Sequence, residues 1–224
     1  TCATGMMAKA LMQQGIGVIT QKLVQTGVSI DSASGKMNIA DDIVTHRQLM
    51  GIPLQPCDLD FTTCLYRYEK PASPHLSVKL ANAVLDFKII TKSTQQLQQS
   101  YDAVLLEGAG GLLVPITEQL LTLDYIAEQD YPVVLVTSGR LGSINHTLLS
   151  LEAIKARGLT LHSVIYNHIH DSAAQTDDEI TNSTIDYLKN YLARHYPNSY
   201  WLQMAQQINS TIGNNNLALP PDFI

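Results

Sequence analysis

Two charged residues follow short apolar runs in a pattern that indicates phosphate chemistry. Lys22 comes after the run at residues 16–20, and Glu107 comes after the run at residues 103–106. A lysine supplies a point charge for a phosphate or carboxylate, and a carboxylate can bind a divalent cation. A lone lysine at such a position is more often a solvated surface residue, so Lys22 becomes informative only together with its neighbours.

A glycine-rich turn directly follows Glu107, in the stretch Gly108-Ala109-Gly110-Gly111. Glycines let the backbone approach a bound group closely and present N–H donors to an anion. An ordinary tight turn between a strand and a helix has the same composition. Both interpretations place the turn at the end of a strand.

Two acidic residues, Asp41 and Asp42, open a predicted helix. Acidic side chains are favoured in a first helical turn by the helix dipole alone. Asp41 together with Glu107 could instead hold Mg²⁺, which takes one or two carboxylates plus phosphate oxygens.

Two further candidates lie in the second half of the chain. Residues 137–146 lead into a predicted helix whose first residues are Gly142, Ser143, Ile144 and Asn145. A helix N-terminus is a ready anion site, although Ser143 also suits a simple cap. Asn167 ends the apolar run at residues 161–166, where its amide could contact a purine edge or form a turn.

Alternating apolar runs and helical patterns predict the elements that position these residues. Strands are predicted at residues 16–20, 61–66, 103–106, 132–136 and 161–166, and helices at 1–14, 38–50, 73–83, 86–97, 123–128, 144–157 and 177–195. This alternation is typical of an α/β fold, doubly wound, with a mostly parallel sheet covered by helices on both faces. Ligands lie beyond the carboxyl ends of such strands, so we expect the candidate residues to converge there.

The composition indicates one compact domain over residues 1–224. Hydrophobic residues make up 45% of the chain against 15% charged, which excludes disorder over most of its length. A formal net charge of −6 argues against nucleic acid or a membrane surface as a partner. With three cysteines in no metal-binding pattern, no membrane-spanning run and no signal peptide, we expect a cytoplasmic protein.

Six stretches, in this order and at compatible spacing, carry a resemblance to a known family. They are Gln21-Lys22 with Thr26-Gly27, Asp41, Ser73-Pro74-His75, residues 104–111, residues 141–146 and residues 164–167. Together they make the sequence resemble the dethiobiotin synthetases of biotin biosynthesis, from Thr1 to about Asn167. That family has the P-loop NTPase type of α/β fold.

The start of the chain bears on this resemblance. The family's phosphate loop ends in Gly-Lys-Thr at the start of the first helix, and Thr1 matches its threonine. The resemblance therefore implies that the first strand and most of the phosphate loop are absent from this chain. The natural protein is then longer, or the chain is impaired as an enzyme.

The resemblance implies an ATP- and Mg²⁺-dependent ligase that closes a ureido ring on 7,8-diaminopelargonic acid with CO2. ATP is a co-substrate, and Lys22 is the catalytic residue that faces the carbamate and the transferring phosphoryl group. The implied ligands of Mg²⁺ and the nucleotide are Thr1, Asp41 and Glu107, with Asn167 towards the base. The implied substrate-binding residues are Thr26, Gly108, Gly110, Gly111, and Gly142, Ser143, Ile144 and Asn145 of a second subunit, so a homodimer is expected.

Some features depart from the family pattern. Arg140 stands where the family commonly has a lysine, and residues 198–224 lack the family's Gly-x-(Ile or Leu)-Pro turn near the base. His168 and His170 could suggest a metal cluster, but we favour an ordinary polar loop. The alternatives are a P-loop switch or carrier ATPase, a related amidoligase and an inactive paralogue. The first lacks a basic amphipathic tail here, and the second lacks room for a glutaminase domain.

Overall fold

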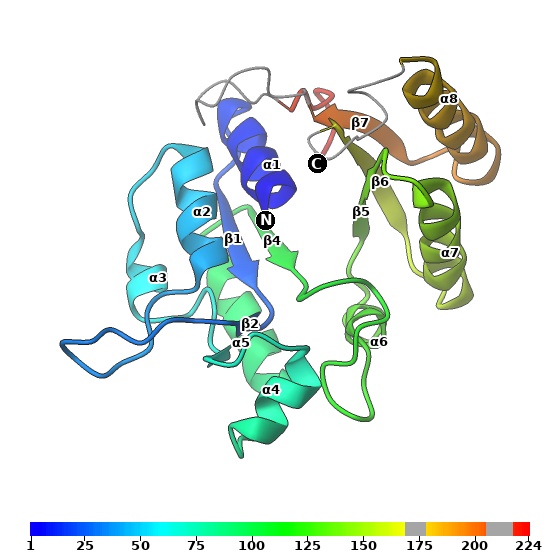
Figure 1. Ribbon diagram of the computed structural model, residues 1–224. Helices are drawn as coiled ribbons and strands as arrows, with labels where there is room; N and C mark the ends of the chain where they lie inside the picture. Colours follow the sequence, from blue (N-terminus) through cyan, green and yellow to red (C-terminus); the bar gives the residue numbers. More distant parts are fainter. Residues whose placement is uncertain (169–177, 205–216) are drawn as a thin grey trace. The chain divides into compact units, whose positions relative to one another are not determined.

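The computed structural model describes residues 1–168, 178–204 and 217–224 (Figure 1). The chain divides into two compact units, Thr1–Tyr125 and Ile126–Ile224. Both units contain parallel strands and helices, and every ladder between named strands of the described residues is parallel. The expected α/β class with a parallel sheet is therefore confirmed, while a single domain over residues 1–224 stays a prediction.

The first unit contains two pairs of strands and most of the helices. Its elements are α1 (Cys2–Gln13), β1 (Val18–Lys22), β2 (Gln25–Thr26), α2 (Asp41–Met50), α3 (Pro56–Leu59), β3 (Arg67–Tyr68), α4 (Pro74–Leu80), α5 (Phe87–Gln98) and β4 (Ala103–Glu107). The strands β1 and β4 pair in parallel, with Lys22 directly opposite Glu107. The two charged residues therefore reach the same carboxyl edge at the same level.

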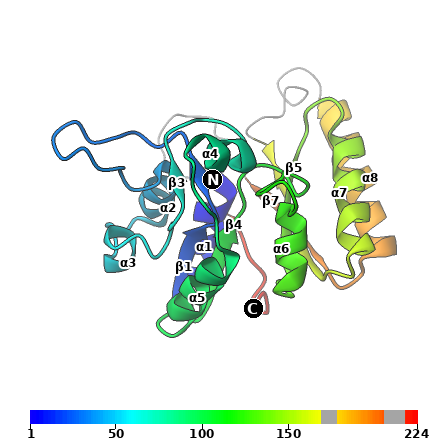
Figure 2. The same ribbon diagram turned by 90° about the horizontal axis from the view of Figure 1, so that it is seen from below.

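Helices cover both faces of β1. Successive side chains of a strand point to opposite faces. Thr20 is bonded by Arg47 of α2, whereas Gln21 accepts a hydrogen bond from Thr94 of α5 at 2.7 Å. Figure 2 accordingly shows α2 and α5 on opposite sides of β1. Lys22 follows Thr20 by two residues, so its side chain lies on the face that α2 covers.

The packing of α1 against α2 fixes the distance between these two helices. Leu11 of α1, Ile19 of β1 and Ile43 of α2 are completely buried. Gly5 of α1 faces Leu49 of α2 so closely that an added Cβ would lie 2.8 Å from the Leu49 Cδ1 atom. The glycine thus allows a close approach of the helix that begins after Thr1 to the helix that begins at Asp41.

The strand predicted at residues 61–66 is wrong. Residues 61–63 form a turn, residues 64–66 belong to no helix or strand, and the short strand β3 comes after them at Arg67–Tyr68. The Asp60 carboxylate accepts hydrogen bonds from the backbone N–H and the hydroxyl of Thr62, at 2.9 and 2.6 Å. Phe61 adopts a positive φ of 67°. Such a local side-chain bond to the backbone favours a turn over an extended strand.

The second unit has a three-stranded parallel sheet in the order β5-β6-β7. After α6 (Thr122–Glu128), which crosses the boundary between the units, come β5 (Val133–Ser138), α7 (Ser143–Ala156), β6 (Leu161–Asn167), α8 (Asp178–His195) and β7 (Tyr200–Met204). The hydroxyl of Tyr196, just after α8, donates to the Leu151 carbonyl of α7 at 2.9 Å. Figure 1 shows α7 and α8 side by side. The sequence did not predict β7.

Candidate active site

A lysine and a glutamate form the centre of the candidate site, at the ends of the paired strands β1 and β4. The Lys22 Nζ atom lies 2.8 Å from Glu107 Oε1 and donates to the Gly108 carbonyl oxygen at 2.9 Å. The parallel register sets this contact because it places the two residues opposite each other. The sequence correctly placed both residues at strand ends, and the structure brings them into contact.

The aspartate that joins them is Asp42, whereas the sequence analysis favoured Asp41. Asp42 Oδ2 lies 2.5 Å from Lys22 Nζ, and the Thr1 hydroxyl donates to Asp42 Oδ1 at 2.9 Å and to Glu107 Oε1 at 3.4 Å. Asp41 is exposed. Successive residues of a helix point about 100° apart, so only one of two adjacent aspartates can face the strand ends. The structure thus brings Asp42 together with Thr1, Lys22 and Glu107, whereas a role of Asp41 in binding Mg²⁺ stays a prediction.

The electrostatics of the site keep both Lys22 and Glu107 charged near neutral pH. Burial disfavours the charge on Lys22, but Glu107 and Asp42 outweigh it and raise the pKa of Lys22 above its ordinary value. Burial likewise disfavours the charge on Glu107. The hydrogen bond from His46 and the charge of Lys22 outweigh it and hold the pKa of Glu107 well below its ordinary value. The site therefore presents a fixed cation between carboxylates.

His46, which was not among the residues predicted from the sequence, contacts the other oxygen of Glu107. His46 Nε2 lies 2.9 Å from Glu107 Oε2, and His46 Nδ1 lies 3.0 Å from the Thr20 hydroxyl. The ring is completely buried. His46 follows Asp42 by four residues, which is the spacing that places two side chains on one face of a helix. That spacing was the signal that could have found it.

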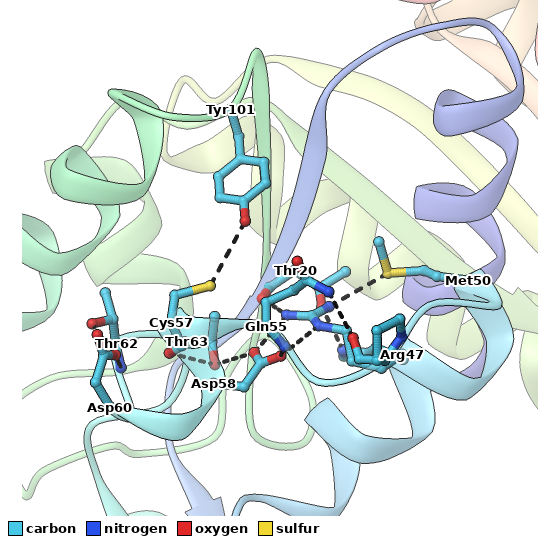
Figure 3. Close-up of polar contacts among 12 residues, drawn as sticks. Thr20, Arg47, Met50, Gln55, Cys57, Asp58, Asp60, Thr62, Thr63 and Tyr101 are labelled. Carbon is cyan, nitrogen blue, oxygen red and sulfur yellow. Dashed lines mark hydrogen bonds and ion pairs between the residues drawn. The ribbon is translucent and has the colours of Figure 1, made fainter.

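A buried ion pair joins Arg47, the residue after His46, to Asp58 (Figure 3). Arg47 donates from Nε and Nη2 to the two carboxylate oxygens of Asp58, both at 2.8 Å, and from Nη1 to the Thr20 hydroxyl at 2.7 Å. Thr63 donates a further hydrogen bond to Asp58 at 2.7 Å. Arg47 and Asp58 are 2% and 0% exposed. A buried pair of this kind needs such complete hydrogen bonding to offset desolvation.

A cavity of about 330 Å³ adjoins Lys22 in the first unit. Thr26 and Gly110 line it, together with Val24, Gln25, Ala72, Ser73, Pro74, Ala109 and Val114. Gly110 has a φ of 88°, and an added Cβ would lie 3.0 Å from the Val114 Cγ2 atom. At Gly108 an added Cβ would lie 3.1 Å from Thr122 Cγ2, whereas at Gly111 it would meet nothing within 4 Å. The structure thus brings Thr26 and the glycine turn beside Lys22.

The remaining predicted residues belong to the second unit. Gly142 precedes α7 with a φ of 88°, and the Ser143 hydroxyl oxygen lies 3.3 Å from that of Ser138. Ile144 is half-buried and Asn145 is exposed in the first turn of α7. Asn167 ends β6, opposite Ser138 of β5. A larger cavity, about 570 Å³, lies between α8 and β7, and the described residues that line it include none predicted for the site.

The two histidines after β6 give no metal centre within the described chain. His168 Nε2 lies 2.9 Å from the Gln203 side-chain oxygen, while His170 lies outside the described residues. In the part that the structure describes, no three or more His, Cys, Asp or Glu side chains are grouped so as to hold a metal ion. A cation at the Lys22 site would therefore need hydroxyl, water or phosphate oxygens in addition to two carboxylates. The described helices include none long and apolar enough to cross a membrane.

Comparison with known proteins gives consistent matches over most of the chain. A family model described as an AAA domain matches residues 30–210. A protein of Haemophilus influenzae named ATP-dependent dethiobiotin synthetase BioD 2 is 55% identical over 75% of this chain and 83% of its own length. A protein of the same name from Pasteurella multocida is 47% identical over 89% of this chain and 88% of its own. The ATP-dependent dethiobiotin synthetase BioD of Chlorobaculum tepidum is 45% identical over 87% of this chain and 77% of its own length.

Proposed function

We propose, because the chain belongs to the family of ATP-dependent dethiobiotin synthetases, that it uses CO2 to close the ureido ring of dethiobiotin on 7,8-diaminopelargonic acid. Membership of this family makes the chain an ATP-dependent ligase with small-molecule substrates. The ring chemistry is inferred from the family, and the roles of individual residues are inferred from the family together with the contacts around Lys22.

The observation that carries the proposal is the meeting of one cation, two carboxylates and a hydroxyl at the ends of β1 and β4. Lys22 contacts Glu107 and Asp42, and the Thr1 hydroxyl reaches both acids. Phosphoryl transfer needs reactants to be positioned and their charge neutralised, with little covalent work by the protein. A fixed cation among oxygen donors supports such a reaction.

The proposed reaction has three steps. First, one amine nitrogen of the substrate attacks the carbon of CO2 and loses a proton, which gives a carbamate. Next, a carbamate oxygen attacks the γ-phosphorus of ATP, and the bond between that phosphorus and ADP breaks. Finally, the second amine attacks the carbamate carbon and loses a proton, and phosphate leaves with the electron pair as the ring closes.

Lys22 acts in the second and third steps as a cation. Its raised pKa means that it keeps its proton, so it stabilises negative oxygens and does not act as a base. In the proposed arrangement its ammonium group faces the carbamate and the transferring phosphoryl oxygens. The bonds to Glu107 and to the Gly108 carbonyl hold that group in place.

The oxygen donors around Lys22 fit Mg²⁺. Carboxylate and hydroxyl oxygens are ligands that this hard cation accepts, with water and phosphate completing its shell. We assign its ligation to Thr1, Asp42 and Glu107, with Asp42 in the place predicted for Asp41. When bound, Mg²⁺ neutralises charge that develops on the phosphate oxygens.

We place the diamine in the cavity next to Lys22. Thr26 lines this cavity and would donate a hydrogen bond to the carbamate. Gly110 also lines it, and the absence of a side chain there lets its backbone lie close to Val114. Gly108 and Gly111 would leave backbone close to the substrate. The distal carboxylate of the substrate would meet the first turn of α7, Gly142 to Asn145, from a second subunit.

Three finer parts of the proposal extend the family likeness. The protein would be a homodimer, because the substrate site takes its anion-binding turn from the second subunit. Asn167 would face the nucleotide base from the end of β6. Cys2, Cys57 and Cys64 are free thiols, which suits a reaction in the reducing cytoplasm.

The test is to supply the full-length protein with diaminopelargonic acid, bicarbonate and MgATP. We expect phosphate release that depends on the diamine and a product with the mass of dethiobiotin. The variant Lys22→Gln should lower kcat by about 100-fold or more, because the transferring group loses its fixed cation. Lys36→Gln, an exposed lysine in the same unit, serves as the matched control. ATP hydrolysis that ignores the diamine would refute the proposal and favour a nucleotide-switched ATPase.

A further inference from the structure

We propose that His46 is a positioning residue that fixes the orientation of the Glu107 carboxylate through a buried chain of hydrogen bonds. The chain runs from Asp58 through Arg47 and Thr20 to His46 and ends on Glu107. The inference rests on the proposed function, since it assigns to Glu107 the binding of Mg²⁺ with the nucleotide.

The two oxygens of Glu107 have separate partners. Oε1 faces the Lys22 ammonium at 2.8 Å and the Thr1 hydroxyl at 3.4 Å. Oε2 faces His46 Nε2 at 2.9 Å. His46 thus binds the oxygen that faces away from the lysine and hydroxyl. A carboxylate held at both oxygens cannot rotate about its terminal bond without losing a contact.

The contact with Glu107 requires a proton on His46 Nε2, because an ionised carboxylate only accepts hydrogen bonds. The Thr20 hydroxyl oxygen accepts a hydrogen bond from Arg47 Nη1, and an arginine does not give up its proton in proteins. The one hydroxyl proton of Thr20 is then free to point towards His46 Nδ1 at 3.0 Å. A ring that accepts at Nδ1 carries its proton on Nε2, where it donates to Glu107.

Asp58 anchors the other end of this chain. Its two carboxylate oxygens accept from Arg47 Nε and Nη2, and Thr63 donates to Oδ1, the oxygen that also accepts from Nη2. Thr20, His46 and Asp58 are 0% exposed, so water does not compete for these bonds. Apolar side chains of similar volume are often no less stable than a buried ion pair. Stability alone therefore does not explain why these buried polar residues are present. The orientation of Glu107, the carboxylate at the end of the chain, explains it better.

A matched pair of variants separates the two ring nitrogens. His46→Gln places an amide N–H donor near the position of Nε2 and keeps the bond to Glu107. His46→Asn is shorter, reaches only the position of Nδ1 and keeps the contact with Thr20. The two variants have the same functional group and both lack the ring.

The direct readout is binding of Mn²⁺ in the presence of ADP, measured from the electron paramagnetic resonance signal of free Mn²⁺. We expect His46→Asn to weaken this binding by about 10- to 100-fold, as loss of an outer partner of a metal ligand does. His46→Gln should recover most of that loss. The Mg²⁺ concentration for half-maximal activity should rise in the same order. His195→Asn, at an exposed histidine in α8, serves as the control.

Thermal unfolding of each variant separates positioning from folding. The proposal is overturned if His46→Gln and His46→Asn bind Mn²⁺ equally, whether both match the wild type or both are weakened. It is supported if the two variants unfold at similar temperatures but differ in Mn²⁺ binding. If the wild type binds Mn²⁺ with ADP but forms no dethiobiotin, the proposed function fails while the Mn²⁺ comparison still tests His46.

Discussion

At the scale of single residues, folding lowers the pKa of Glu107, so the charged form of this side chain stabilises the folded protein. Burial disfavours its charge, but His46 and Lys22 lower its pKa below the ordinary value. A carboxyl whose pKa is lower in the folded state contributes stability above its unfolded pKa, about 4.3. That contribution is lost as the pH falls from there through the folded pKa.

We therefore expect Glu107→Gln to reduce the acid sensitivity of the fold. Below about pH 4.3, the free energy of unfolding of the wild type changes by at most about 1.4 kcal/mol per pH unit because of this one group. The variant lacks this contribution. The two proteins should differ most at neutral pH and converge in acid. Urea unfolding from pH 3 to pH 6 measures this, with exposed Glu69→Gln as the control. Parallel curves for Glu107→Gln and the wild type would contradict it.

Lys22 and Glu107 could be identified from the sequence because each follows an apolar run that marks the end of a strand, a local signal that needs no knowledge of distant contacts. Which of Asp41 and Asp42 contacts Lys22 could not be predicted in the same way, because it depends on the rotation of α2 about its axis. Five buried residues of α2, among them Ile43 and Leu49, set that rotation by packing against the rest of the unit. His46 was missed for a related reason, since a histidine in an amphipathic helix is ordinary until its partners Thr20 and Glu107 are known.

At the scale of elements, the close packing of α1 on α2 determines how Thr1 meets Asp42. An added Cβ at Gly5 would lie 2.8 Å from Leu49 Cδ1, 3.0 Å from Leu49 Cβ and 3.2 Å from the His46 Cα atom. The Leu49 side chain can rotate, but its Cβ and the backbone of His46 move only if α2 moves. The absence of a side chain at Gly5 therefore allows α2, which carries both Asp42 and His46, to pack in its observed position.

Gly5→Ala should destabilise the protein although it lies within a helix. Alanine favours a helix over glycine by about 1 kcal/mol, but overpacking a core costs about 1 to 3 kcal/mol, so we expect a net loss of up to about 2 kcal/mol. The value of kcat should also fall, because a shift of α2 moves Asp42 and His46 away from their partners at the site. Chemical denaturation and kcat measure the two effects. Gly111→Ala, where an added Cβ meets nothing within 4 Å, is the control for stability. A more stable Gly5→Ala variant would refute this packing argument.

Helices and strands with strong local signals were predicted well, and those set by distant contacts were not. Gly51, which is left-handed after α2, and Asp86, which caps α5 by accepting from Lys88 N–H at 2.9 Å, agree with the helices predicted at residues 38–50 and 86–97. The segment at residues 61–66 has strand-forming residues, yet it turns because Asp60 bonds to Thr62. The Arg67 guanidinium then lies 3.4 Å from the centre of the Phe61 ring, a contact that sequence patterns do not reveal.

At the scale of the whole molecule, an acidic protein must bind anionic ligands. The formal net charge is −6, whereas ATP is negative, as are the carbamate and the substrate carboxylate of the proposed reaction. Positive potential must therefore be local. In the first unit Lys22 together with the proposed Mg²⁺ would supply it, and in the second unit the first turn of α7, where Asn145 is exposed, offers backbone N–H groups. The proposed homodimer would bring these two sources to one substrate.

Mixing two inactive variants tests that arrangement. Lys22→Gln removes the cation, and Asn145→Asp places a negative charge in the exposed first turn of α7, where it repels the substrate carboxylate but suits the helix dipole. In a mixed dimer, one site combines the intact Lys22 of one subunit with the intact α7 of the other. Random mixing gives half mixed dimers with one intact site of two, so about a quarter of the wild-type activity should return.

The recovery should require exchange of subunits, so activity should rise with time after mixing and a dimer should be seen by analytical ultracentrifugation. Pairing Lys22→Gln with Glu107→Gln is the matched control, because both residues belong to the same unit and no dimer then contains an intact site. Activity of the first mixture that stays at the mean of its two components would show that Lys22 and α7 serve the same site within one subunit, or that the chain acts alone. A quarter recovery in the first mixture and none in the control would assign α7 to the partner's site.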